Sequence, residues 1–145
     1  AMLPFCGYNM SDYFQHWLNT GDKLAAAGAT LPRIYTTNWF RKNAAGKFVW
    51  PGYGDNMRVL KWMIDRIEGQ AQGTETALGV APTYAEINWT GIEFSPEQFE
   101  NVTSIDPAAW QEELKLHDEH FEKLAYHMPQ ALLDTKAALA KRLAG

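Results

Sequence analysis

The residues best suited to bind a flat organic ring lie between positions 38 and 56, where five of nineteen side chains are aromatic. These aromatic residues are Trp39, Phe40, Phe48, Trp50 and Tyr53. Aromatic side chains bind other flat rings by stacking. Asn56 follows the cluster, and its amide can both donate and accept a hydrogen bond. The stretch therefore favours a pocket for a flat ring, and the alternative is an aromatic cluster that only packs a core.

A β-hairpin is the structure expected to position these aromatic residues. Residues 34–40 and 48–50 are rich in β-branched and aromatic types, which favour strands. Residues 43–46 lie between them, and Gly46 can adopt the positive φ of a tight turn. Pro51 has no N–H to donate and stops the pairing after the second strand.

A bend and a helix are predicted to follow the hairpin. Gly52 and Gly54 allow a sharp turn, and Asp55 or Asn56 can begin the helix. The helix is predicted over residues 56–68, because apolar residues repeat there at helical spacing. These apolar residues are Val59, Leu60, Met63, Ile64 and Ile67. The positive end of the helix would then lie beside the aromatic cluster.

Cap and breaker signals predict further helices on both sides of this region. Ser11 caps a helix over residues 11–20, which Gly21 ends. Residues 95–97 open another helix, and a long one is expected over residues 106–127. Pro129 forces a break before the last helix. The expected fold class is α+β, an aromatic hairpin with four or five helices.

Length and composition predict one globular unit over residues 1–145. Hydrophobic residues make up 46% and charged residues 21% of the chain. The net charge of −4 and the lack of a basic run argue against a nucleic acid or an acidic membrane as partner. No apolar run is long enough to predict a membrane span. A single cysteine, Cys6, fits a reducing, cytoplasmic setting. Residues 76–94 are expected to be irregular.

Motifs for phosphate and metal chemistry are missing from the sequence. No G-x-x-x-x-G-K-[ST] loop occurs, so a triphosphate with Mg²⁺ cannot be held in that way. Glu113, His117 and His120 share one helix face, but the setting indicates a partly solvated surface rather than a metal site. Arg41 and Lys42 could reach a ribose or phosphate, or remain solvated. No catalytic residue and no metal ligand are assigned.

Four stretches resemble one enzyme family. They cover residues 4–9, 16–18, 38–42 and 48–60, from Pro4-Phe5-Cys6-Gly7-Tyr8-Asn9 to Phe48-Val49-Trp50-Pro51-Gly52-Tyr53-Gly54-Asp55-Asn56-Met57-Arg58-Val59-Leu60. Together they are similar to the C-terminal part of GTP-dependent phosphoenolpyruvate carboxykinase. The resemblance is close over residues 1–69, and residues 70–145 are expected to form a mostly helical tail.

The resemblance implies a role for four residues. In that family the hairpin and turn hold the guanine base, so Phe40, Phe48 and Tyr53 would stack on it and Asn56 would read its edge. The family usually has Phe at position 53 and Glu at position 55, where this chain has Tyr53 and Asp55. Tyr53 keeps the stacking face and adds a hydroxyl.

The resemblance also implies what a longer parent chain does. It would be a cytoplasmic lyase of gluconeogenesis that converts oxaloacetate and GTP to phosphoenolpyruvate, GDP and CO₂. This chain would be a fragment of its larger α/β nucleotide-binding domain. In the family the phosphate loop, the Mn²⁺ ligands and the catalytic residues precede this region. The isolated fragment is therefore expected to be inactive. Its expected partners are a guanine nucleotide and the rest of the parent chain. The parent is expected to be a monomer.

The alternative function is a non-catalytic binding module. Six Trp and six Tyr could form an aromatic platform for a sugar or a peptide.

Overall fold

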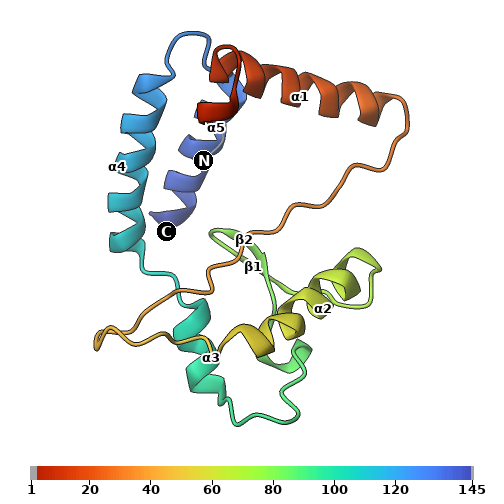
Figure 1. The fold of residues 1–145 in the computed structure, drawn as a ribbon, viewed down its shortest axis with the longest axis vertical. Helices are drawn as coiled ribbons and strands as arrows, with labels where there is room; N and C mark the ends of the chain where they lie inside the picture. The colour runs from red at the N-terminus through yellow and green to blue at the C-terminus, as the bar shows by residue number, and fades with distance from the viewer. Residues whose placement is uncertain (1–2, 145) are drawn as a thin grey trace. The chain divides into compact units, whose positions relative to one another are not determined.

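The computed structural model describes residues 3–144, and Figure 1 traces them from end to end. The chain forms two compact units: one joins the residues up to Pro32 with those from Asp106 onward, and the other spans Arg33–Ile105. The described residues contain five α-helices and one two-stranded antiparallel sheet. The α+β class and the helix number are therefore confirmed. None of the described helices combines the length and apolarity that a bilayer span requires.

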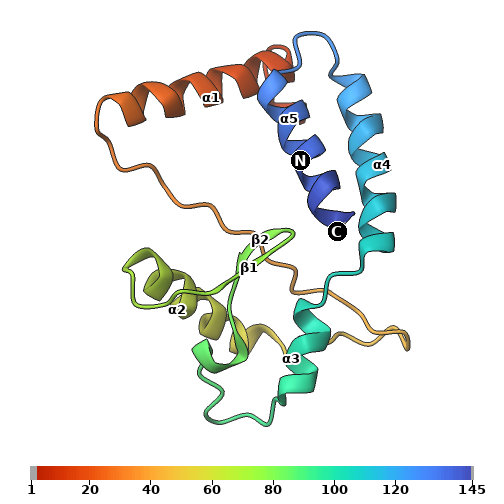
Figure 2. The same cartoon turned by 180° about the vertical axis from the view of Figure 1, so that it is seen from behind.

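The first unit is helical. It contains the short 3₁₀ helix η1 (Leu3–Phe5) and the α-helices α1 (Met10–Ala26), α4 (Pro107–Lys123) and α5 (Gln130–Leu143). Helices α4 and α5 lie side by side and are joined by a short loop (Figures 1 and 2). The predicted starts of α4 and α5 are confirmed, because Asp106 caps α4 by accepting from the Ala108 N–H at 2.9 Å and α5 begins directly after Pro129.

Helix α1 differs from the prediction at both ends. Its N-cap is Asn9, whose side chain accepts from the Ser11 N–H at 2.8 Å. Ser11 instead is fully buried, and its hydroxyl donates to the Leu124 carbonyl oxygen at 2.6 Å. The helix also passes through Gly21 to Ala26. Glycine in a helix costs only about 1 kcal/mol, and the good helix formers after it can offset that amount.

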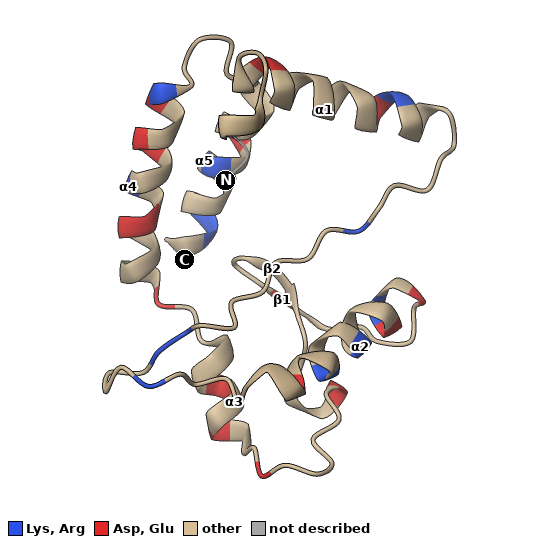
Figure 3. Cartoon of the chain, viewed as in Figure 1, with Lys and Arg blue, Asp and Glu red and all other residues tan. Residues whose placement is uncertain are grey.

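The second unit is built around α2 (Asn56–Ile67), the strands β1 (Thr74–Thr76) and β2 (Gly79–Ala81), and α3 (Pro96–Thr103). Two short 3₁₀ helices accompany them, η2 (Tyr53–Asp55) and η3 (Tyr84–Glu86). The strands pair in the register Thr74↔Ala81, Glu75↔Val80 and Thr76↔Gly79. The centre of the unit is Trp62 of α2, 3% exposed, packed with Ala71 and Ile87. Helix α2 carries both basic and acidic residues, whereas the charged residues of α3 are all acidic (Figure 3).

The strands predicted at residues 34–40 and 48–50 are wrong. An isolated antiparallel bridge joins Lys42 and Phe48, and the Asn43 N–H donates to the Lys47 carbonyl oxygen at 2.9 Å. The turn itself is confirmed, since Gly46 has φ 74° and donates to the Asn43 carbonyl oxygen at 2.9 Å. A two-stranded ribbon needs a third strand or a packed face for stability, so the aromatic pattern alone does not produce strands here.

The hairpin of the structure lies instead in residues 74–81, most of which were expected to be irregular. The Glu86 carboxylate stabilises it from outside: it accepts hydrogen bonds from the Gln72 and Gly73 N–H groups at 2.9 and 2.8 Å. Thr76 adds a bond from its hydroxyl to the Gly79 carbonyl oxygen at 2.7 Å. Strands this short carry little periodic signal, which explains why the sequence pattern missed them.

Helix α2 is confirmed, and its buried residue is Trp62 rather than a member of the predicted apolar set. Leu60, Ile64 and Ile67 are 40%, 49% and 58% exposed, whereas Trp62 is buried. The single large indole determines which side of the helix faces the core, because it removes more apolar area from water than any one aliphatic residue of the stripe.

Candidate functional site

The bend before α2 depends on one glycine. Gly52 has φ 148° and ψ −178°, a backbone conformation that other L-residues rarely adopt. The Asp55 N–H then donates to the Gly52 carbonyl oxygen at 3.1 Å, which closes η2 and starts α2 at Asn56. The predicted bend is thus confirmed at Gly52, while Gly54 is not among the residues with positive φ. The tight turn leaves Tyr53 92% exposed.

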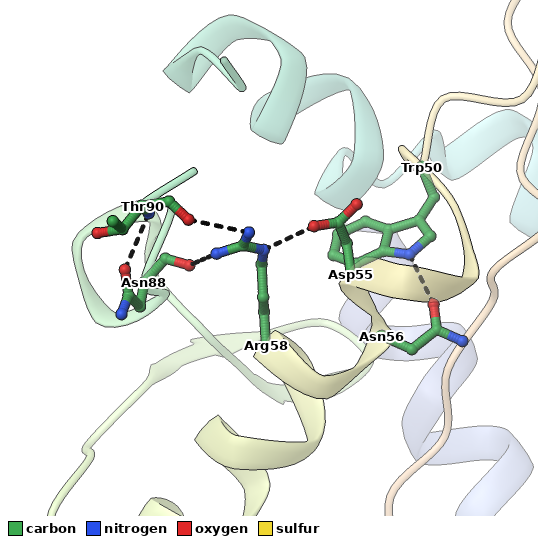
Figure 4. A network of polar contacts seen from close by, with 6 residues as sticks. All are labelled: Trp50, Asp55, Asn56, Arg58, Asn88 and Thr90. Atoms are coloured by element: carbon green, nitrogen blue, oxygen red, sulfur yellow. Dashed lines mark hydrogen bonds and ion pairs between the residues drawn. The ribbon is translucent and has the colours of Figure 1, made fainter. Parts of the chain in front are cut away.

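Asn56 is held by a tryptophan rather than by the helix start. The indole Nε1–H of Trp50 donates to the Asn56 Oδ1 atom at 2.8 Å, and the amide nitrogen points away from Trp50 (Figure 4). An indole N–H can only donate, so chemistry as well as geometry assigns the amide oxygen to Trp50. Among residues 3–144 the amide nitrogen donates to no protein acceptor, so it is available to a ligand.

An ion pair holds the first turn of α2. The Asp55 Oδ1 atom accepts from the Arg58 Nε–H at 2.8 Å. Both side chains are less than one-fifth exposed. Arg58 also donates to the carbonyl oxygens of Asn88 and Thr90 (Figure 4). Asp55 occupies the N-cap position without making a capping bond. Sequence reasoning missed Arg58, although an Asp-x-x-Arg spacing at a helix start is a recognisable ion-pair signal.

An open pocket of about 390 Å³ lies between residues 35–39 and the start of α2. Its walls are mostly apolar, as suits a flat ring, with an amide on one side. The lining residues are Tyr35, Thr37, Trp39, Tyr53, Gly54, Asn56, Met57, Leu60 and Met63.

Phe40 and Phe48 form a separate aromatic pair. Their ring centroids are 6.1 Å apart in an edge-to-face arrangement, and the residues are 73% and 59% exposed. Phe48 lines a second pocket, of about 410 Å³, beside residues 41–44 and the end of α3. The four predicted site residues therefore lie in two groups: Phe40 with Phe48, and Tyr53 with Asn56.

Arg41 connects the turn to helix α3. Its Nη1 donates to the carbonyl oxygens of Val102 and Ser104 at 3.0 and 2.6 Å, and its Nη2 donates to the Ser104 hydroxyl at 2.9 Å. The guanidinium thereby satisfies carbonyl groups at the helix end, where a cation is favourable. Arg41 is consequently committed to a structural contact. Lys42 instead lies over the Phe48 ring, with its Nζ 5.1 Å from the ring centroid.

The described part of the chain does not assemble a metal site. Among residues 3–144 no three His, Cys, Asp or Glu side chains gather in a way that could hold an ion. The resemblance places the Mn²⁺ ligands before this region, so no reaction step is assigned to the metal here.

Comparison with known proteins decides the family. A family model described as the phosphoenolpyruvate carboxykinase C-terminal P-loop domain, in its GTP-dependent form, matches residues 1–142. The chain belongs to the GTP-dependent phosphoenolpyruvate carboxykinase family. The resemblance in the sequence motifs is thus confirmed, and the match includes the helical residues after position 69.

Relatives from several bacteria are similar over almost the whole chain. Proteins named phosphoenolpyruvate carboxykinase [GTP] are 44% identical over 146 residues in Treponema pallidum (strain Nichols) and 45% identical over 143 residues in Anaeromyxobacter sp. (strain K). The Paenarthrobacter aurescens relative is 44% identical over 143 residues. These alignments cover 99–100% of this chain but 23% of each relative. The chain therefore spans about a quarter of their length.

Proposed function

We propose that this chain is the base-binding part of a GTP-dependent phosphoenolpyruvate carboxykinase. The longer protein would be a cytoplasmic lyase that converts oxaloacetate and GTP to phosphoenolpyruvate, GDP and CO₂ in gluconeogenesis. Family membership and the names of the relatives support this activity. The same match favours it over a sugar- or peptide-binding module.

The work of the longer enzyme is divided between its parts in this proposal. The present sequence has no phosphate-loop motif, and its described residues gather no metal ligands. Mn²⁺ binding, phosphate binding and the bond-breaking steps would come from the remaining three-quarters of the protein. Residues 1–69 would supply the guanine site, within a larger α/β nucleotide-binding domain of a monomeric enzyme.

The observation that carries the base-binding role is the free amide nitrogen of Asn56 at the edge of an apolar pocket. Stacking on Tyr53 would bind any base, because all bases offer a flat face. The amide would add selectivity, since its N–H groups can donate to the carbonyl oxygen at C6 of guanine. Adenine has an amino group at that position. This group and the Asn56 amide would both present N–H donors, so no hydrogen bond could form between them.

Phe40 and Phe48 supply two further stacking surfaces in this proposal. Both rings are exposed, so binding a base against them would remove apolar area from water.

The test is steady-state kinetics of the full-length protein with Tyr53→Ala and Asn56→Ala. Loss of base contacts should raise the KM for GTP and leave the KM for oxaloacetate unchanged. The matched control is Tyr126→Ala, an exposed tyrosine of the other unit, which should change neither value. A rise in the oxaloacetate KM alone would contradict the proposed role.

A further inference from the structure

Trp50 makes a polar contact with the proposed base site although it does not line the pocket. It is 7% exposed, and its indole N–H donates to the Asn56 Oδ1 atom at 2.8 Å (Figure 4). Because indole is a donor only, the bond exists in a single orientation of the Asn56 amide.

The surrounding rings keep Trp50 in place. Its centroid lies 5.5 Å from that of Trp39, 6.4 Å from that of Trp89 and 6.1 Å from that of Phe94. A turned Asn56 amide would point N–H groups at the N–H of the buried indole, and a buried donor without a partner is costly. The amide nitrogen is therefore held on the side away from Trp50.

We propose that Trp50 is a positioning residue that sets the hydrogen-bonding polarity of the base site. By binding the amide oxygen, it leaves Asn56 only N–H donors to offer a ligand. Such a site accepts purines with a carbonyl at C6 and opposes purines with an amino group there. This inference rests on the proposed role of Asn56 in base recognition.

The first test is Trp50→Phe in the full-length protein, which removes the N–H and keeps an aromatic ring. Dissociation constants are measured for GTP, ITP and ATP, because ITP has the C6 carbonyl without the amino group at C2. With the amide free to turn, the preference for GTP and ITP over ATP should fall by about 5- to 10-fold, the effect of one ordering hydrogen bond.

Trp89→Phe is the matched control. It removes an indole N–H from the same aromatic cluster, but this group donates to the Tyr84 carbonyl oxygen at 2.9 Å. Its melting temperature should fall while the nucleotide preference stays unchanged. An unchanged preference in Trp50→Phe, or an equal fall in both variants, would overturn the proposal.

Asn56→Asp tests the same polarity without touching Trp50, should Trp50→Phe fail to fold. One carboxylate oxygen can still accept from the indole, while the other replaces the donor offered to the base. The preference should shift toward ATP, whose amino group can donate to that oxygen. Retention of the wild-type preference for GTP would overturn the proposal.

Asn56→Ala separates the two levels of inference. If this variant keeps the wild-type preference for GTP over ATP, the proposed base-reading function fails. If it loses the preference while a folded Trp50→Phe retains it, Asn56 reads the base and only the positioning role of Trp50 fails.

Discussion

The Glu86 carboxylate accepts a hydrogen bond from the Gly73 N–H at 2.8 Å, which joins η3 to the start of the hairpin across thirteen positions of sequence. The same carboxylate accepts from the N–H of Gln72 and from the N–H and hydroxyl of Thr83. The bonds from Gly73 and Thr83 lower the pKa of Glu86 from 4.5 to about 2. These contacts favour the ionised carboxylate in the folded state.

The lowered pKa of Glu86 predicts acid sensitivity. A depressed folded-state pKa adds stability that is complete above pH 4.5 and disappears as the pH falls toward about 2. Glu86→Gln should lower stability at pH 7 by about 1–2 kcal/mol and flatten its pH dependence in that window. Glu75→Gln, an exposed change in β1, serves as the control. Thermal melts between pH 2 and pH 7 provide the measurement, and parallel curves for Glu86→Gln and wild type would contradict the assignment.

Gly73→Ala should destabilise the hairpin strongly. A Cβ atom there would lie 2.6 Å from Val80 Cγ1 and 2.8 Å from the Ala81 carbonyl oxygen, at a φ of +68°. Gly69→Ala is the matched control, because its φ is +78° and nothing lies within 4 Å of the added atom. Strain alone costs about 1–2 kcal/mol, so Gly69→Ala should lose that amount and Gly73→Ala clearly more. Equal unfolding free energies in denaturant would show that the Gly73 contacts relax at no cost.

Phe48→Ala in the full-length protein should weaken nucleotide binding. Loss of one base stack costs about 1–3 kcal/mol, equivalent to an increase of about 5- to 150-fold in the nucleotide KM. The oxaloacetate KM should not change. The opposite pattern would indicate that the Phe40–Phe48 pair is structural.

The isolated chain should have neither decarboxylase nor kinase activity. The sequence has no phosphate-loop motif, and residues 3–144 gather no metal ligands. The measurement is turnover of oxaloacetate with GTP and Mn²⁺, with the full-length enzyme as positive control. Turnover that depends on both GTP and Mn²⁺ in a sample free of full-length enzyme would contradict this prediction.

The start of α2 illustrates what sequence reasoning predicts well. Gly52 marks the bend and Asn56 the first helical residue, because backbone freedom and helix signals are local properties. The family resemblance could also be identified from the sequence, since its motifs are long and occur in the same order.

Features that depend on contacts between distant parts of the chain could not be predicted from the sequence pattern. The strand prediction for residues 34–40 was wrong because strand formation depends on neighbouring segments that the sequence pattern does not specify. The apolar spacing in α2 did not identify its buried residue, Trp62. The bond from Trp50 to Asn56 was missed because it crosses the Gly52 turn, whose geometry decides where each side chain points.

The measurement closest to the central claim is the affinity of full-length Asn56→Ala for GTP, ITP and ATP, taken together with its melting temperature. Loss of the bond from the amide to the C6 carbonyl should weaken binding of GTP and ITP equally, by about 1–3 kcal/mol, and should not weaken binding of ATP. The melting temperature reports separately on the lost bond to Trp50. An equal loss for all three nucleotides would contradict base reading by Asn56.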